Sequence, residues 1–116
     1  MPMTAVAITF LNVLLLVLGQ VLWKTGMIHH PFRTIANLPS LIMNPYVLLG
    51  SFVYTVATVV WLYGLSRYDL SRIYPLQSLA YVLGAAAGVY FFKETISLRQ
   101  WIGLALVVGG AALLAR

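Results

Sequence analysis

The hydrophobic positions of this chain fall into four stretches, and polar residues gather between the stretches and at their ends. The stretches cover about residues 4–23, 46–65, 72–92 and 98–115. The first has no charged residue, and about 20 residues at ~1.5 Å per residue match the ~30 Å hydrocarbon core of a bilayer. The last reaches a comparable length only when its first turn from Leu98 is counted. We therefore predict an all-α membrane protein with four transmembrane helices in a single domain, residues 1–116.

The composition also indicates that the chain is embedded in a lipid bilayer. Hydrophobic residues make up 62% of the chain and charged residues 8%, and only two of the 116 residues are acidic. A soluble domain carries about a quarter charged residues. The chain has no cysteine, and the adjacent His29 and His30 point to different faces of a helix or strand, so we expect no metal and no cofactor. No nucleophile–base pair stands out, which argues against an enzyme.

The net charge is +5, but the basic residues stand singly at the ends of the stretches. Because nucleic acid is bound by clustered basic residues, we expect no nucleic acid and favour lipid head groups or an anionic substrate. The first stretch has no basic region before it and no small-residue cleavage site after it. We therefore expect it to be a membrane span and not a signal peptide.

One stripe of the third stretch is polar. Tyr74, Gln77, Ser78 and Tyr81 are spaced i, i+3, i+4 and i+7, which places them on one face of a helix. Polar groups inside a bilayer are costly unless they face a partner or a cavity. The stripe therefore predicts either a ligand-facing wall or hydrogen bonds between helices.

The first two stretches carry similar faces. In the first, Leu16 lies among polar, small and aromatic residues at helical spacing: Asn12, Gly19, Gln20 and Trp23. Buried there, Asn12 and Gln20 need partners or water. Lys24 ends this stretch and can either snorkel to the interface or contact substrate. In the second stretch one face holds Tyr54, Thr58 and Trp61, while Gly50 allows another backbone to approach closely.

The connections contain prolines and capping residues. Pro31 and Pro39 prevent residues 28–44 from forming one continuous helix, so we expect a segment lying in the membrane interface; a lid is the alternative. Before the third stretch either Asp69 or Ser71 can cap the helix, and a Ser71 cap would place Pro75 in the first turn. Before the fourth stretch, Ser97 and Gln100 have capping-box spacing.

Two features indicate a dimer. Four short helices enclose too little volume for an alternating-access cavity, and Gly103 and Gly110 form a small-residue face suited to helix association. The run from Gly84 to Gly88 suits close helix packing. Basic residues on the two membrane sides differ in number by only one, so the positive-inside rule hardly fixes orientation. Both an antiparallel homodimer and a heterodimer with a similar small subunit remain open. The basic residues on the side of the first and third connections are Lys24, Arg33, Lys93 and Arg99, and those on the side of the termini are Arg67, Arg72 and Arg116.

The chain resembles the four-span members of the drug/metabolite transporter superfamily, which include EamA-like and small multidrug resistance-like proteins. It is most similar to the small flippase subunits that move undecaprenyl phosphate aminoarabinose. The resemblance rests on Gly19-Gln20-Val21 followed by Lys24, on Tyr74-Pro75 followed by Ser78-Leu79, and on Glu94, Arg99, Trp101, Gly103 and Gly109-Gly110. It covers most of the chain except residues 27–44. It implies a multi-pass protein of the bacterial inner membrane.

Small multidrug resistance exporters are the rival branch. Their coupling of drug and proton transport rests on a glutamate in the middle of the first helix, and counting back from Lys24 places Leu16 at that position. The only carboxylates of this chain, Asp69 and Glu94, lie near membrane edges. This departure argues against proton-coupled drug export.

The leading hypothesis is a flippase for an anionic, polyprenyl-phosphate-linked sugar or a similar amphiphile, with the phosphate held by Lys24, Arg72 or Lys93. One alternative is an exporter of cationic or aromatic compounds. Its aromatic cage would consist of Trp23, Tyr54, Trp61, Tyr74 and Tyr81. Another is an accessory subunit of a heteromeric membrane complex. The candidate substrate-binding residues are Asn12, Gln20, Lys24, Tyr54, Trp61, Arg72, Tyr74, Gln77, Ser78, Tyr81, Lys93 and Glu94.

Overall fold

The computed structural model describes residues 3–31 and 33–115, and all regular structure in these ranges is helical. Four of its segments are long and apolar enough to cross a membrane: Met3–His29, Pro45–Arg67, Leu70–Phe92 and Leu98–Ala115. The expected all-α membrane fold with four spans is confirmed. The first helix continues about six residues beyond the predicted hydrophobic stretch, past Lys24 to His29.

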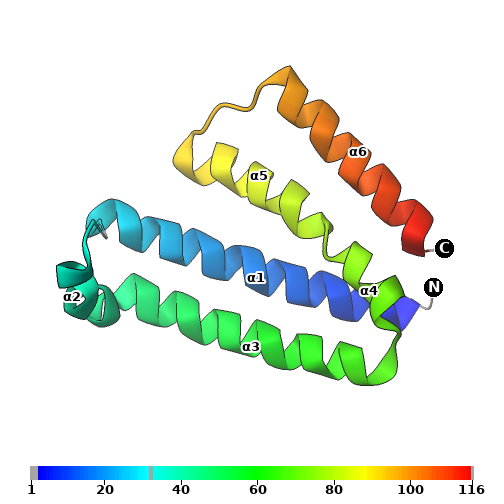
Figure 1. Ribbon diagram of the computed structural model, residues 1–116, viewed down its shortest axis with the longest axis horizontal. Coiled ribbons are helices and arrows are strands. Elements are labelled where there is room, and N and C mark those ends of the chain that lie inside the picture. Colours follow the sequence, from blue (N-terminus) through cyan, green and yellow to red (C-terminus); the bar gives the residue numbers. More distant parts are fainter. Residues whose placement is uncertain (1–2, 32, 116) are drawn as a thin grey trace.

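Helices α1 (Met3–His29) and α3 (Pro45–Arg67) form an antiparallel hairpin and pack along their whole length (Figure 1). Small residues permit this close approach. A Cβ atom added to Gly50 would lie 3.0 Å from the carbonyl oxygen of Gly19 and 2.7 Å from Cδ1 of Trp23. Farther along the two helices, Val13 of α1 and Ala57 of α3 are fully buried. The expected close backbone approach at Gly50 is present.

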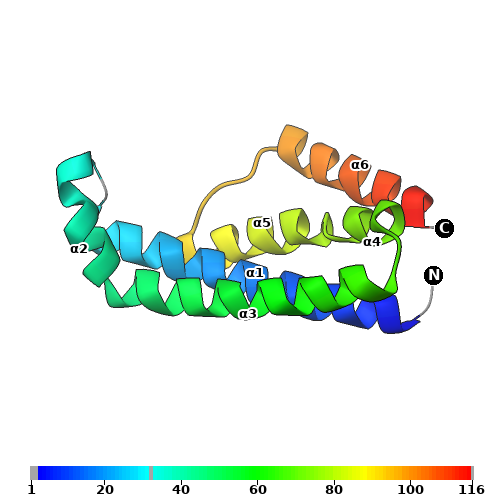
Figure 2. The same cartoon turned by 60° about the horizontal axis from the view of Figure 1, so that its bottom comes forward.

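The connection between these helices contains η1 (Ile35–Asn37) and the short α2 (Leu38–Met43), which projects from the end of the hairpin (Figure 2). Asn44 ties it down. Its Oδ1 accepts a hydrogen bond from the backbone N–H of Tyr46 (2.9 Å), which caps α3, and its Nδ2 donates to the carbonyl of Gly26 in α1 (3.1 Å). The interruption expected from the prolines is therefore present, and its location in a membrane interface stays a prediction.

The third span consists of two helices, α4 (Leu70–Leu76) and α5 (Leu79–Phe92), separated at Gln77 and Ser78. Of the two caps that the sequence allowed, Asp69 occupies the N-cap position of α4, although its side chain makes no capping hydrogen bond. Ser71 lies inside the helix, so Pro75 falls in the second turn and not in the first. A proline there lacks the N–H for the helical bond and crowds the preceding turn. The backbone then tightens: Gln77 N donates to Tyr74 O (2.9 Å) and Ser78 N to Pro75 O (3.0 Å).

Helix α6 (Leu98–Ala115) begins at the expected capping box. The N–H of Ser97 donates to Oε1 of Gln100 (2.9 Å), and the N–H of Gln100 donates to Oγ of Ser97 (3.3 Å). The helix packs mainly against α4 and diverges from α5 toward its own first turn (Figures 1 and 2). A Cβ atom at Gly103 or Gly110 would meet no atom within 4 Å. The small-residue face of α6 is therefore unpacked within the described chain, and its role in a dimer stays a prediction.

Candidate functional site: a neutral cavity beside a charged pocket

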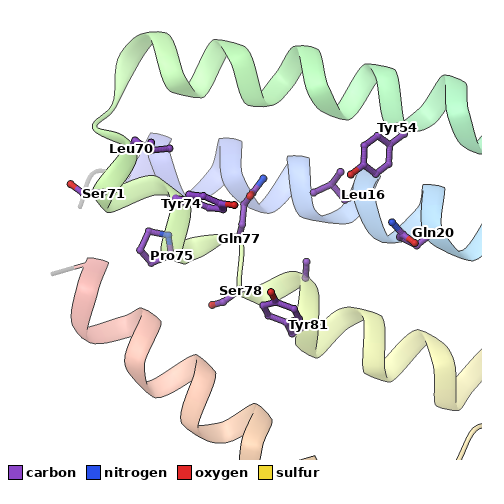
Figure 3. A pocket seen from close by; sticks show the side chains of 11 residues that line it. Leu16, Gln20, Tyr54, Leu70, Ser71, Tyr74, Pro75, Gln77, Ser78 and Tyr81 are labelled. Carbon is purple, nitrogen blue, oxygen red and sulfur yellow. The ribbon is translucent and has the colours of Figure 1, made fainter.

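A large cavity, about 1060 Å³, lies where α1 and α3 face α4 and the start of α5 (Figure 3). Polar and aromatic groups line much of it, and none of its described lining residues is charged. Its wall consists of Leu16, Gln20, Tyr54, Leu70, Ser71, Tyr74, Pro75, Gln77, Ser78, Ala80 and Tyr81. A concave site with a few convergent polar groups is typical of small-ligand binding.

Half of the residues proposed from the sequence meet at this cavity. They come from three different stretches of the chain: Gln20 from α1, Tyr54 from α3, and Tyr74, Gln77, Ser78 and Tyr81 from the third span. The other lining residues lie at three places: Leu16 on α1, Leu70 and Ser71 in the first turn of α4, and Pro75 and Ala80 on either side of the break between α4 and α5. For the last place the sequence carried a signal, because a proline in the middle of the polar stripe interrupts the helix there.

The polar stripes were expected either to face a ligand or to make hydrogen bonds between helices, and the structure shows both arrangements at neighbouring residues. Asn12 is 1% exposed and does not line the cavity. Its Nδ2 donates to the carbonyl of Ala57 in α3 (2.7 Å), and its Oδ1 accepts a hydrogen bond from Nε2 of Gln77 (2.8 Å). Asn12 therefore links three elements from behind the wall, while Gln77 both closes this link and faces the cavity.

The two tryptophans of the proposed aromatic cage support tyrosines of the wall. The Trp23 ring stacks on Tyr54, with centroids 4.9 Å apart, and its Nε1 donates to the carbonyl of Val47 and to Oγ of Ser51, both at 3.2 Å. Trp61 contacts Tyr74 edge to face at 6.1 Å. Neither tryptophan lines the cavity itself.

Ser78 occupies the break between the helices and has an unusual hydroxyl. Its Oγ is buried but makes no hydrogen bond to any described residue. Its side chain points away from that of Gln77 (Figure 3). A buried hydroxyl without a partner costs stability, so the break between α4 and α5 carries an energetic cost at Ser78.

A second, smaller pocket of about 180 Å³ adjoins the first and shares Gln20 with it. It holds an ion pair between Lys24 Nζ and Glu94 Oε2 (3.2 Å), and both side chains are about half exposed. Lys24 therefore has a specific partner within the chain, and both roles expected for it, snorkelling to the interface and contact with substrate, stay predictions. The pocket is completed by small and apolar residues of α1 and α5: Val17, Val21, Gly84, Ala87, Gly88 and Phe92.

The end of α5 positions Glu94. Lys93 adopts the left-handed conformation (φ 55°), which closes the helix, and the N–H of Glu94 donates to the carbonyl of Gly88 (3.1 Å). The chain thereby folds Glu94 back over the helix. A Cβ atom at position 88 would lie 2.5 Å from its Oε1, so Gly88 provides the room. The close helix packing expected of the Gly84–Gly88 run is not seen within the described chain: a Cβ atom at Gly88 would meet only Glu94, and one at Gly84 would meet nothing within 4 Å.

Two proposed basic residues lie elsewhere. Arg72 and Lys93 are exposed, and neither lines the neutral cavity or the charged pocket. Lys93 is committed to the turn that ends α5. Among residues 3–31 and 33–115, no three His, Cys, Asp or Glu side chains lie close enough to hold a metal ion.

The sequence model of the EamA-like transporter family matches residues 1–116. The chain belongs to this family. Together with its four apolar helices, this makes it a multi-pass membrane protein of a transporter family.

This EamA-like chain is similar to several curated bacterial proteins. Over 71 residues it is 37% identical to the probable 4-amino-4-deoxy-L-arabinose-phosphoundecaprenol flippase subunit ArnE of Pseudomonas fluorescens Pf0-1 (61% of this chain, 62% of that protein). Over 111 residues it is 32% identical to the subunit ArnF of Serratia proteamaculans (89% and 85%). Over 110 residues it is 29% identical to ArnE of Pseudomonas aeruginosa LESB58 (95% and 96%).

The extent of these matches differs. The chain spans 62%, 60% and 54% of the lengths of the first three curated relatives, and much more of the Serratia and Pseudomonas aeruginosa proteins. No solved structure matches the chain.

Proposed function

We propose that this protein is a small subunit of a flippase in the bacterial inner membrane, and that it moves the head group of a polyprenyl-phosphate-linked amino sugar across the bilayer. The observation that carries the proposal is the large cavity with an uncharged, polar and aromatic wall, assembled from spans that belong to a transporter family. The names of the similar ArnE and ArnF proteins supply the substrate class.

The chemistry of the wall suits a sugar. The amides of Gln20 and Gln77 and the hydroxyls of Tyr54, Tyr74 and Tyr81 both donate and accept hydrogen bonds, as sugar hydroxyls require. These groups replace the water that the head group loses on leaving the membrane surface. The polyprenyl tail needs no such replacement, because it stays among the lipid chains. The protein therefore has only the head group to solvate.

The phosphate requires a cation at the membrane edge. Lys24 fits this role best, because it lies in the pocket that shares Gln20 with the neutral cavity. Ammonium groups bind phosphate as compact point charges. Arg72 and Lys93 stand outside both cavities, so they are candidates for the membrane surface and not for the interior path.

Export of cationic or aromatic compounds is the second candidate, favoured by the rings of Tyr54, Tyr74 and Tyr81 around one cavity. Against it stands Leu16. This residue occupies the position at which small multidrug resistance exporters carry their glutamate, and it lines the cavity wall. A cation in this cavity would therefore find aromatic faces but no carboxylate.

The same proposal includes a partner, either a second copy or a similar small subunit. It is supported by the open glycine face of α6 and by the many large apolar side chains exposed on the described chain. Lipid can cover such side chains, but small residues favour contact with another helix.

Native mass spectrometry of the gently extracted protein tests the function. We expect a dimer that retains a polyprenyl phosphate lipid, and we expect Lys24→Ala to lose that lipid while Arg33→Ala, a basic residue of the connection, keeps it. A wild-type complex that never carries such a lipid, from cells that make it, would contradict the proposal. Co-purification of a different small membrane protein would identify the partner as heteromeric.

A further inference from the structure

The charged residues of the two cavities are unevenly distributed. None of the described residues that line the neutral cavity is charged, whereas the adjoining pocket has one cation and one anion, Lys24 and Glu94, in contact with each other. Glu94 is one of only two acidic residues in the whole chain, and Asp69 is the other. A site for a simple anion would gain nothing from a carboxylate beside its lysine, since the carboxylate competes with the ligand and repels it.

The position of Glu94 is built into the local structure. The left-handed Lys93, the hydrogen bond from Glu94 N to Gly88 O and the missing side chain of Gly88 together turn the carboxylate into the pocket. Half of each side chain in the ion pair remains exposed, so both charges are within reach of a ligand. An exposed ion pair contributes little to stability. It can therefore be opened and replaced by other ion pairs at low cost.

We infer that Lys24 and Glu94 form a receptor for a zwitterionic head group, in which Lys24 binds the lipid phosphate and Glu94 binds a primary amine on the sugar. This inference rests on the proposed flippase function and adds its specificity: the chain selects lipid phosphates whose sugar carries an ammonium group. In the structure the two side chains satisfy each other. Binding of the ligand replaces this ion pair by two others, one between Lys24 and the phosphate and one between Glu94 and the ammonium group.

Gln20 connects this receptor to the neutral cavity, because its side chain lines both. The head group is accordingly selected by charge at the edge formed by the end of α1 and the turn after α5. It then enters a chamber that offers only neutral hydrogen-bonding groups. Residues 93–97, which connect α5 to α6 and carry Glu94, form no helix or strand, so Glu94 can follow the ligand without breaking a helix.

The test compares two lipids that differ in one group. The full chain in lipid nanodiscs is titrated with aminoarabinosyl phosphoundecaprenol and with the same lipid bearing a hydroxyl in place of the amine, and binding is read by native mass spectrometry. We expect the wild type to prefer the amine by about tenfold, as one added charge-assisted contact at a half-exposed site provides. Glu94→Gln should abolish the preference by weakening only the amine lipid, and Glu94→Asp should restore part of it. Asp69→Asn, the other carboxylate, should keep the wild-type ratio.

The outcomes separate the two proposals. Equal binding of both lipids by the wild type would overturn the inference and leave the flippase function standing. A Glu94→Gln variant that loses affinity for both lipids equally would show that Glu94 only supports the fold, and would also overturn it. Binding of neither lipid to the wild type would overturn the proposed function itself and the receptor with it.

Discussion

The side-chain amide of Gln77 donates a hydrogen bond to Oδ1 of Asn12 across the interface between the third span and the first. Asn12 in turn donates to the carbonyl of Ala57, so one buried asparagine joins α1 and α3 to the break between α4 and α5. This link fixes the position of the interrupted helix on the hairpin. The cavity wall depends on that position, because Tyr74, Pro75 and Ser78 surround Gln77 in sequence.

The link should be measurable as a coupling energy. Asn12→Ala should lower the free energy of unfolding by about 1–2 kcal/mol, and a double-mutant cycle with Gln77→Ala should give a coupling of about 1 kcal/mol, typical of hydrogen bonds between membrane helices. Thr9→Val is the matched control, since Thr9 is equally buried but its hydroxyl donates only to Ala5 O within α1. Reversible unfolding in mixed micelles measures these values. Additive effects of the two alanine changes would contradict the link.

Close packing of α1 on α3 should make Gly50 intolerant of a side chain. A methyl group there meets the Gly19 carbonyl and the ring of Trp23, which is held by its stack on Tyr54. Gly50→Ala should therefore cost about 1–3 kcal/mol. Gly103→Ala, where the added atom meets nothing, should leave the unfolding free energy unchanged or raise it by up to ~1 kcal/mol through helix propensity. Equal effects at the two glycines, by the same unfolding assay, would refute this account of the hairpin.

The glycine face of α6 should be the dimer contact. The double variant Gly103→Leu with Gly110→Leu should abolish the dimer while the helical content of the chain is kept, because the leucines block close approach of a second helix.

The control places two leucines on a different exposed face of α6, away from the glycines. Ala105→Leu with Ala112→Leu also changes two exposed positions seven residues apart. It should leave the dimer intact. Crosslinking in native membranes reads both variants, and a dimer that survives the glycine changes would place the contact on another helix.

A carboxylate in the neutral cavity should oppose an anionic lipid. Leu16→Glu places a carboxyl group in the wall beside Gln20, and we expect it to reduce retention of polyprenyl phosphate by about tenfold or more through like-charge repulsion. Leu16→Gln adds polarity without charge and should reduce retention much less. Native mass spectrometry of both variants measures the effect, and equal losses would mean that shape at position 16 matters and charge does not.

The sequence predicted the spans well because hydrophobic runs, proline positions and the Ser97–Gln100 spacing are local signals. It also named Gln20, Tyr54 and the residues of the stripe from Tyr74 to Tyr81 among twelve candidate substrate-binding residues, because each is polar or aromatic on a helix that otherwise faces lipid. These six line one cavity, and the other six do not. The cap of α4 was left open between Asp69 and Ser71, and the structure has Asp69. Both residue types are good caps, so the local sequence alone does not choose between them.

Long-range contacts account for the other differences. No local pattern predicts the contact between Lys24 and Glu94, which are about 70 residues apart in the sequence. The contact requires both the docking of α5 on α1 and the left-handed turn at Lys93. In the same way Arg72 has the right charge for a phosphate site, but the packing of α4 leaves it outside the cavity. Charge is visible in a sequence, whereas the direction of a side chain at a helix end is not.

Transfer of the lipid between leaflets tests the central claim most directly. The protein, with any subunit that co-purifies, is reconstituted into liposomes containing aminoarabinosyl phosphoundecaprenol, and a membrane-impermeant amine reagent reports how fast the inner-leaflet lipid reaches the outside. The account predicts transfer well above that of protein-free liposomes, slowed several-fold by Gln20→Leu in the cavity wall and unaffected by Phe52→Leu, an exposed apolar position on α3. A rate equal to that of protein-free liposomes would contradict the account.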